Sequence, residues 1–163
     1  MLDFSPSKCL RKEMENQANI EYISTDFAGE FEAQKNYDIT NIKESDSSFD
    51  LIICFHVLEH IEDDRQAMKE LFRVLKEGGK ALIQTPFKAG DIFEDITIRT
   101  PEDRLKNFGQ EDHVRVYSVE GLKKRLEQAG FVVQALSFAA TNNNEGDERM
   151  GMKKEEAILV ATK

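Results

Sequence analysis

Three ionisable side chains follow the apolar segment Phe49 to Phe55, and residues of these types could do acid–base chemistry or bind a metal ion. His56, Glu59 and His60 lie within five consecutive positions. The His-x-x-x-His spacing can place two imidazoles on one helix face, but the glutamate of the His-Glu-x-x-His zinc motif is absent and no third ligand is evident. We therefore expect no metal ion, and we expect these side chains to cap a helix or to pack against a ligand.

The third histidine of the chain stands later, between Asp112 and Arg115. An imidazole titrates near neutral pH, so His113 is a candidate general base. The stretch from Phe87 to Arg115 shows no clean periodicity, and an irregular segment of that length in a compact domain is commonly functional. The alternative is a histidine in a surface loop.

Two aspartates end predicted strands. A carboxylate such as Asp26 at the end of a strand can accept hydrogen bonds from both hydroxyls of a ribose, although a turn or helix cap is the simpler explanation. Asp38 could accept from the exocyclic amine of an adenine, or it could only shape the turn before Thr40. Ser5-Pro6 predicts a helix N-terminus that could bind an anion, but no glycine-rich loop strengthens this signal.

The elements that position these residues alternate between strands and helices. Asn19 and Asp26 bound one alternating segment, and Phe49 to Phe55 reads as a strand buried on both faces. A helix with an apolar stripe follows, and Gly78-Gly79 is expected to end it. The predicted elements of this half are a helix over Pro6–Gln17, strands over Ile20–Thr25, Tyr37–Ile39, Phe49–Phe55 and Lys80–Thr85, and the stripe Ala67, Met68, Leu71, Phe72 and Leu75.

The second half repeats the pattern after an irregular stretch that Pro101 interrupts. Ser118 is expected to cap a helix that Gly130 ends, because its apolar residues recur at helical spacing. Strands are predicted over Phe131–Phe138 and Ala157–Thr162, with a polar, mobile segment over Thr141–Glu155. The chain is therefore predicted as one α/β domain with a mostly parallel sheet and one antiparallel edge.

Composition excludes several classes of function. A chain of 163 residues suits one domain, and no apolar run approaches the roughly 20 residues that span a membrane. The net charge of −9 argues against a nucleic-acid partner. Cys9 and Cys54 are too few for a disulfide scaffold, and no signal peptide is evident, so we expect a soluble cytoplasmic protein.

Two segments together resemble the class I S-adenosylmethionine-dependent methyltransferases. FDLIICFHVLEHIEDDRQAMKELFRVLKEGGKALIQTP is similar to the fourth and fifth strand region of that family, and HVRVYSVEGLKKRLEQAGF resembles its later Ala-Gly-Phe segment. The N-terminal MLDFSP looks closest to a methyltransferase type 11-like bacterial branch whose first strand reads VLHFAPE. The resemblance implies a Rossmann-like, seven-stranded, mostly parallel sheet with an antiparallel terminal strand.

The resemblance also implies a transferase that methylates a small or medium acceptor by in-line displacement, with S-adenosylmethionine as cofactor. Residues 4 and 5 would bind the amino-acid moiety, 26 the ribose, 38 and 39 the adenine, and 55 and 56 the sulfonium side. The cofactor-binding candidates are thus Phe4, Ser5, Asp26, Asp38, Ile39, Phe55 and His56. The catalytic candidates are His113 and His56, and the candidate walls of the acceptor pocket are Phe87, Phe93 and Phe108. The acceptor itself is not identified.

Two other hypotheses stay open. Family members carry helices before the first strand, so a chain that starts there is expected to be short and to lack its N-terminal helices. It could be a fragment, or it could form a homodimer that covers the apolar sheet face. Such a chain could also be a non-catalytic or truncated interaction module. A nicotinamide or nucleotide-sugar enzyme would need G-x-G-x-x-G after the first strand, which is absent.

Overall fold

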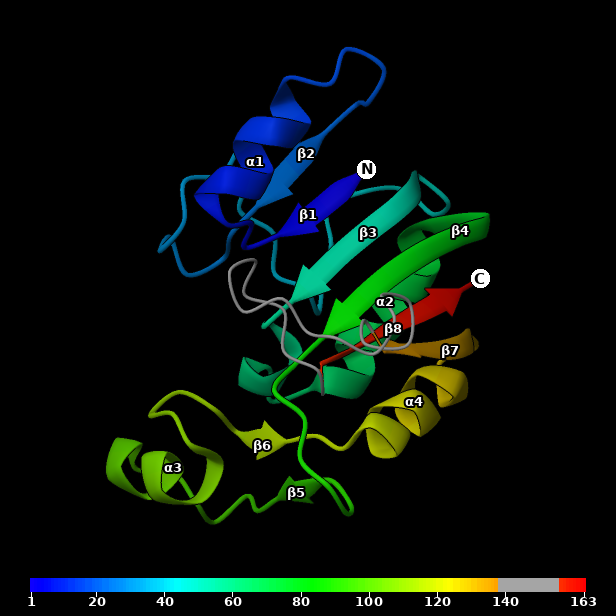
Figure 1. The fold of residues 1–163 in the computed structure, drawn as a ribbon. Coiled ribbons are helices and arrows are strands. Elements are labelled where there is room, and N and C mark those ends of the chain that lie inside the picture. Colours follow the sequence, from blue (N-terminus) through cyan, green and yellow to red (C-terminus); the bar gives the residue numbers. More distant parts are fainter. Residues whose placement is uncertain (138–155) are drawn as a thin grey trace.

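The fold is built on one twisted six-stranded sheet with strand order β2-β1-β3-β4-β8-β7 (Figure 1). The computed structural model describes residues 1–137 and 156–163. The sheet strands are β1 (Leu2–Phe4), β2 (Ile23–Thr25), β3 (Phe49–Phe55), β4 (Leu75–Gln84), β7 (Val132–Ser137) and β8 (Ala157–Thr162). Strands β1 to β4 pair in parallel, whereas β8 runs antiparallel to both β4 and β7. The predicted mostly parallel sheet with an antiparallel terminal strand is confirmed, with six strands in the described residues where seven were expected.

Helices and a small second sheet complete the fold. They are α1 (Lys8–Glu15), the 3₁₀ turn η1 (Leu58–His60), α2 (Asp64–Val74), β5 (Phe93–Glu94), α3 (Pro101–Phe108), β6 (Arg115–Val116) and α4 (Val119–Gln128). Helix α2 packs on β4, and α4 packs on β7 and β8 and against α2, so both cover the same face. None of the helices in residues 1–137 and 156–163 is both long and apolar enough to cross a membrane.

Strand β3 is the centre of the sheet, and its composition explains why. Ile52, Ile53 and Cys54 are all buried. Because successive side chains of a strand point to opposite faces, this strand is covered on both faces, as its apolar run predicts. In Figure 1 the arrowheads of β3 and β4 point toward the segment that carries β5, α3 and β6. The carboxyl ends of the central strands therefore face that segment.

The first helix begins later than its sequence predicts. Ser7, and not Ser5, is the N-cap of α1, and its side chain accepts a hydrogen bond from the Leu10 amide. Ser5 instead adopts a left-handed conformation with φ of 49°. Its hydroxyl donates to Asp26 at the end of β2, and the helix is capped by Ser7 instead.

The predicted strand over Tyr37–Ile39 is wrong. On the side of β2 that faces away from β1, the described residues make a single parallel bridge. It joins Thr25 and Lys35, two residues before the predicted segment. Tyr37 and Ile39 are nevertheless buried in the core, which explains why the segment reads as a strand. The Tyr37 amide donates to the hydroxyl of Thr25 rather than to a backbone carbonyl.

The predicted C-terminal end of α2 is also wrong. The helix ends at Val74, not at the glycine pair, and Leu75 already belongs to β4. Gly78 does have the positive φ that glycine permits, 73°, but it turns the chain inside β4. Regular pairing with β3 resumes at Lys80, opposite Leu51.

Part of the stretch from Phe87 to Arg115 is regular, contrary to expectation. Pro101 begins helix α3 instead of interrupting the segment, because proline suits the first helical position. Thr100 caps this helix by accepting from the Asp103 amide. The helix capped by Ser118 and the strands β7 and β8 are confirmed. The segment Thr141–Glu155, predicted to be mobile, lies outside the described residues.

Candidate active site

The candidate site residues gather where parallel strands end. Ser5 follows β1, Asp26 follows β2 and His56 follows β3. The registers of these strands pair Phe4 with Thr25 on one side and with Cys54 on the other, so the three ends are level. Open α/β sheets bind ligands at this edge.

Ser5 and Asp26 form the best-defined contact at that edge. The Ser5 amide donates to the Thr25 carbonyl at 2.7 Å, and its hydroxyl donates to Asp26 Oδ1 at 2.8 Å. Asp26 Oδ2 accepts from the amides of Glu30 at 2.8 Å and Phe31 at 3.2 Å. A carboxylate has about four acceptor sites. Three are therefore used, and one remains for a ligand.

The other proposed cofactor residues are spread along the same edge. Phe4 is buried and Phe55 is half-buried. Ile39 is buried in the hydrophobic core. Asp38 accepts from both the amide and the hydroxyl of Thr40, at 2.8 and 2.7 Å, as the simple turn explanation expects. Oδ1 makes both of these contacts, so Oδ2 is the oxygen that a ligand could use.

His56 is held in a strained conformation beside a buried carboxylate. Its φ of 55° lies in the left-handed region, which is uncommon for non-glycine residues and concentrates at functional sites. Its amide donates to the Gln84 carbonyl at 2.9 Å. The imidazole is 57% exposed, and Nδ1 lies 3.5 Å from Oε1 of Glu59. The Glu59 carboxylate raises the pKa of His56.

His113 is brought to the same place by its neighbours. The Val114 amide donates to the Glu59 carbonyl at 2.9 Å, which ties this segment to η1. The rings of His60 and His113 meet edge to face with centroids 4.7 Å apart. His113 is buried, and burial and the nearby His60 lower its pKa. The structure thus unites both predicted catalytic histidines with Glu59, which sequence reasoning had noted only as a neighbour.

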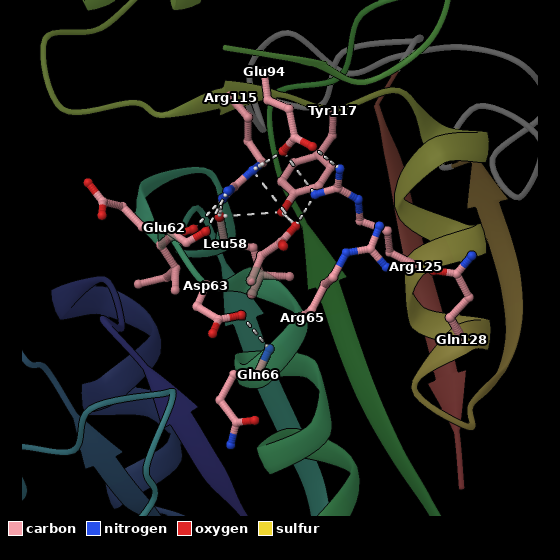
Figure 2. A network of polar contacts seen from close by, with 12 residues as sticks. Leu58, Glu62, Asp63, Arg65, Gln66, Glu94, Arg115, Tyr117, Arg125 and Gln128 are labelled. Atoms are coloured by element: carbon pink, nitrogen blue, oxygen red, sulfur yellow. Dashed lines mark hydrogen bonds and ion pairs between the residues drawn. The ribbon is translucent and has the colours of Figure 1, made fainter. Parts of the chain in front are cut away.

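A polar network holds the segment after β4 over the strand ends (Figure 2). The Arg115 guanidinium donates to the carbonyls of Leu58, Ile61 and Glu62. Arg115 also pairs with Glu94 at 3.1 Å. This arginine was noted in the sequence only beside His113, because the carbonyls that it binds lie 53 to 57 positions away.

The network continues through a buried aspartate. Asp64 Oδ2 accepts from the Tyr117 hydroxyl and from Arg125, both at 2.5 Å. Arg125 also bonds Glu94 at 2.5 Å. Figure 2 shows these side chains converging between the start of α2 and the start of α4. These contacts fix the position of α4 relative to η1, which carries Glu59 and His60 of the candidate site.

A cavity of about 560 Å³ lies in the segment beyond the strand ends. Its lining residues are Glu62, Glu94, Asp95, Ile96, Ile98, Arg99, Arg104, Val114 and Arg115. Two of the three phenylalanines expected to wall an acceptor pocket, Phe93 and Phe108, meet in this segment with ring centroids 5.5 Å apart. None of the three lines the cavity, whose charged groups come mainly from acidic and arginine side chains.

Comparison with known proteins places the chain in one family. A family model described as a methyltransferase domain matches residues 9–136. A probable S-adenosylmethionine-dependent methyltransferase of Mycolicibacterium smegmatis is 37% identical over 90 residues, 55% of this chain. A tRNA U34 carboxymethyltransferase of Wolinella succinogenes is 33% identical over 60% of this chain. A ubiquinone biosynthesis O-methyltransferase of Rickettsia felis is 39% identical over 42% of it.

The matched parts cover 31%, 34% and 29% of those three proteins, so the chain spans about a third of the length of these curated relatives. Solved structures show the fold at lower identity. The [4+2]-cyclase SpnF aligns with a TM-score of 0.66 at 16% identity, over 99% of this chain and 74% of its own. A methyltransferase of Thermotoga maritima, titled a possible histamine N-methyltransferase, gives 0.63 at 17%, over 99% and 81%.

Proposed function

This chain belongs to the methyltransferase-domain family of class I, S-adenosylmethionine-dependent proteins, and we propose that it transfers a methyl group to a small or medium-sized acceptor. S-adenosylmethionine supplies a methyl group on a sulfonium, which reacts by in-line displacement when the acceptor is well positioned. The observation that carries the proposal is the Ser5–Asp26 contact at the ends of β1 and β2.

The residues at this edge fit such a cofactor. Ser5 adopts the positive φ that a glycine-rich loop would otherwise supply, so the backbone shape survives without glycine. Asp26, 5% exposed, offers a carboxylate for a ribose diol. Phe4 and Ser5 are the candidates for the amino-acid moiety, Asp38 and Ile39 for the adenine, and Phe55 and His56 for the sulfonium side.

His56 is the stronger of the two candidate general bases. A base must reach the proton it removes, and the His56 ring is half exposed whereas the His113 ring is buried. Glu59 lies beside Nδ1 and can orient the ring. In this assignment His113 packs behind the site, and it acts as a base only if the acceptor reaches the inner side of η1.

Calorimetric titration with S-adenosylmethionine and S-adenosylhomocysteine tests the cofactor assignment. We expect one saturable site that Asp26→Ala weakens at least about tenfold, since a diol–carboxylate contact is a charge-assisted hydrogen bond. Glu32→Gln is the matched control, because Glu32 is an exposed carboxylate that pairs with Arg11 in the same region. Equal affinity of the wild type and Asp26→Ala would refute the ribose role.

Methyl transfer is tested by the appearance of S-adenosylhomocysteine with a panel of acceptors. The relatives include a ubiquinone biosynthesis O-methyltransferase and a tRNA U34 carboxymethyltransferase, and we propose a small oxygen or nitrogen acceptor because the net charge of −9 disfavours RNA. His56→Gln should lower turnover by a larger factor than it lowers cofactor affinity, because a general base acts on the acceptor.

A non-catalytic interaction module is the second candidate. One similar fold is titled a cyclase, so this fold alone does not establish methyl transfer. Three of the four acceptor sites of Asp26 are also already used within the chain. A folded chain that binds neither S-adenosylmethionine nor S-adenosylhomocysteine would favour this candidate.

A further inference from the structure

Glu59 is a buried carboxylate that no hydrogen bond satisfies. Its side chain is 2% exposed, and neither oxygen has a hydrogen-bond partner in the part of the chain that the structure describes. Nδ1 of His56 stands 3.5 Å from Oε1 and can serve only one of the two oxygens. An ionised carboxylate is costly to bury without partners, so a cation bound to the oxygen that His56 does not serve would be stabilised.

Two imidazoles lie beside this carboxylate. One ligand atom from each of Glu59, His60 and His113 lies within 4.8 Å of the other two. Glu59 and His60 are neighbours on η1, and the bond from the Val114 amide to the Glu59 carbonyl fixes His113 against them. The three donors therefore converge on a backbone framework that is already rigid.

The outer partner of His60 leaves one of its ring nitrogens free. Nδ1 of His60 is 2.9 Å from Oδ2 of Asp112, so Nε2 is the nitrogen that remains. Histidines that bind metals typically donate their second N–H to a carboxylate or a backbone carbonyl. Asp112 is such a partner for His60.

We propose that Glu59, His60 and His113 bind one divalent transition-metal ion, with zinc the best suited. Two imidazoles and one carboxylate are a ligand set that such ions accept, and three protein ligands leave a position open for water or an acceptor atom. Bonds of about 2.1 Å require donors roughly 3.4 Å apart, so the side chains must close around the ion by about 1 Å. This proposal departs from the expectation from the sequence, which found no third ligand for His56 and His60 and expected no metal ion.

The chain composition makes the site easy to test. It has three histidines, Cys9→Ser removes the exposed cysteine as a competing ligand, and the remaining Cys54 is fully buried. The untagged Cys9→Ser protein is titrated with Zn²⁺ by calorimetry and with Co²⁺ by visible absorption. We expect one ion per chain and a d–d spectrum of low coordination number. Circular dichroism confirms that each variant is folded.

The variants separate this site from the other roles of its residues. Glu59→Gln, which keeps the shape of the side chain, and His60→Gln should each weaken binding at least about a hundredfold. Asp112→Asn, which only loosens the outer partner of His60, should weaken binding about ten- to a hundredfold. Glu62→Gln, which makes the same chemical change at an exposed carboxylate three residues after Glu59, is the matched control and should bind as the wild type does.

Three results would overturn the proposal. They are the absence of stoichiometric binding, undiminished binding by Glu59→Gln, or a loss in Glu62→Gln as large as the loss in Glu59→Gln. If His113→Gln fails to fold, Glu59→Gln and His60→Gln still decide the question. Because these titrations need neither S-adenosylmethionine nor an acceptor, their outcome is independent of the proposed methyl transfer.

Discussion

The hydroxyl of Ser5 donates a 2.8 Å hydrogen bond to Asp26 and thereby joins the ends of β1 and β2. Ser5 does this from a left-handed backbone conformation, which costs a non-glycine residue about 1 kcal/mol or more. The same residue therefore combines a stabilising bond with local strain.

Substitutions of Ser5 should separate these two effects. Ser5→Ala loses the bond and keeps the strain, so we expect it to unfold at lower urea concentration, with a loss of about 1 kcal/mol. Ser5→Gly loses the bond but relieves the strain, and it should be more stable than Ser5→Ala by about 1 kcal/mol. If the alanine variant were the more stable of the two, the strain at this position would not be real.

Cofactor binding should disturb the loop after Asp26. The carboxylate has about one acceptor site left, and a ribose diol offers two hydroxyls. Binding should therefore release the Glu30 or Phe31 amide, which hydrogen exchange detects as faster exchange upon addition of S-adenosylhomocysteine. The Tyr37 amide, bound to the Thr25 hydroxyl, is the internal reference and should not speed up. Unchanged exchange at both loop amides would argue against a diol on Asp26.

Asp3 should make the protein less stable as the pH rises from about 4 to about 7. Burial raises the pKa of Asp3 from 3.8 to about 6, although the Tyr22 hydroxyl bonds it at 2.9 Å. Burial also raises the pKa values of two nearby groups, the Tyr22 hydroxyl and the Cys54 thiol, so neither ionises between about pH 4 and about pH 7. The native state keeps the Asp3 proton to a higher pH than the unfolded chain does. The contribution is therefore full below about pH 4 and is lost as the pH passes about 6.

The variant Asp3→Asn isolates this effect, because asparagine cannot ionise but can still accept from Tyr22. The free energy of unfolding of the wild type relative to Asp3→Asn should fall by on the order of 2–3 kcal/mol between about pH 4 and about pH 7. Urea unfolding at the two pH values measures it. A constant difference would show that Asp3 ionises normally.

Asp64 should be far more important for stability than its neighbour Asp63. Asp64 is 3% exposed and binds Arg125 and Tyr117, so Asp64→Asn leaves a buried arginine short of its partner. We expect a loss of about 3–5 kcal/mol in urea unfolding. Asp63→Ala, which removes only the cap to the Gln66 amide, should cost about 1 kcal/mol. Equal losses would mean that Glu94 alone satisfies Arg125.

Gly130 should tolerate alanine less well than Gly90 does. Both have a positive φ, 112° and 100°, so alanine strains the backbone at each. A Cβ at Gly130 would also come within 2.9 Å of the Phe72 ring, whereas one at Gly90 would meet nothing within 4 Å. Gly130→Ala should therefore be less stable by about 1–3 kcal/mol beyond Gly90→Ala, as measured by thermal unfolding.

Local sequence patterns were sufficient to predict an element wherever burial of its side chains decides the structure. The apolar run of β3 and the Ser118 cap of α4 were predicted at their observed positions, because composition and capping chemistry act over a few residues. The strand predicted over Tyr37–Ile39 was wrong because burial and strand pairing are different properties. Apolar residues indicate burial, and here the chain buries them without pairing them as a strand.

The candidate site was predictable only in part. Its strand-end members, Ser5, Asp26 and His56, follow from the fold class, since ligands collect where parallel strands end. The approach of His113 to Glu59 depends on a backbone bond that spans 55 positions, between Val114 and Glu59, and no local spacing encodes it.

The hydrogen bonds from Arg115 to the carbonyls in and after η1 have a consequence for the order in which the protein folds. The carbonyls of Leu58, Ile61 and Glu62 find this partner only after more than fifty further residues have been added to the chain. Contacts of such sequence separation form slowly, because the loop between them must close first. During synthesis the central strands can pair while the turn that carries Glu59 and His60 still lacks its anchor. The turn that carries Glu59 and His60 should therefore become ordered after the central strands have paired, and truncated chains that end before Arg115 should lack the contacts that hold this turn.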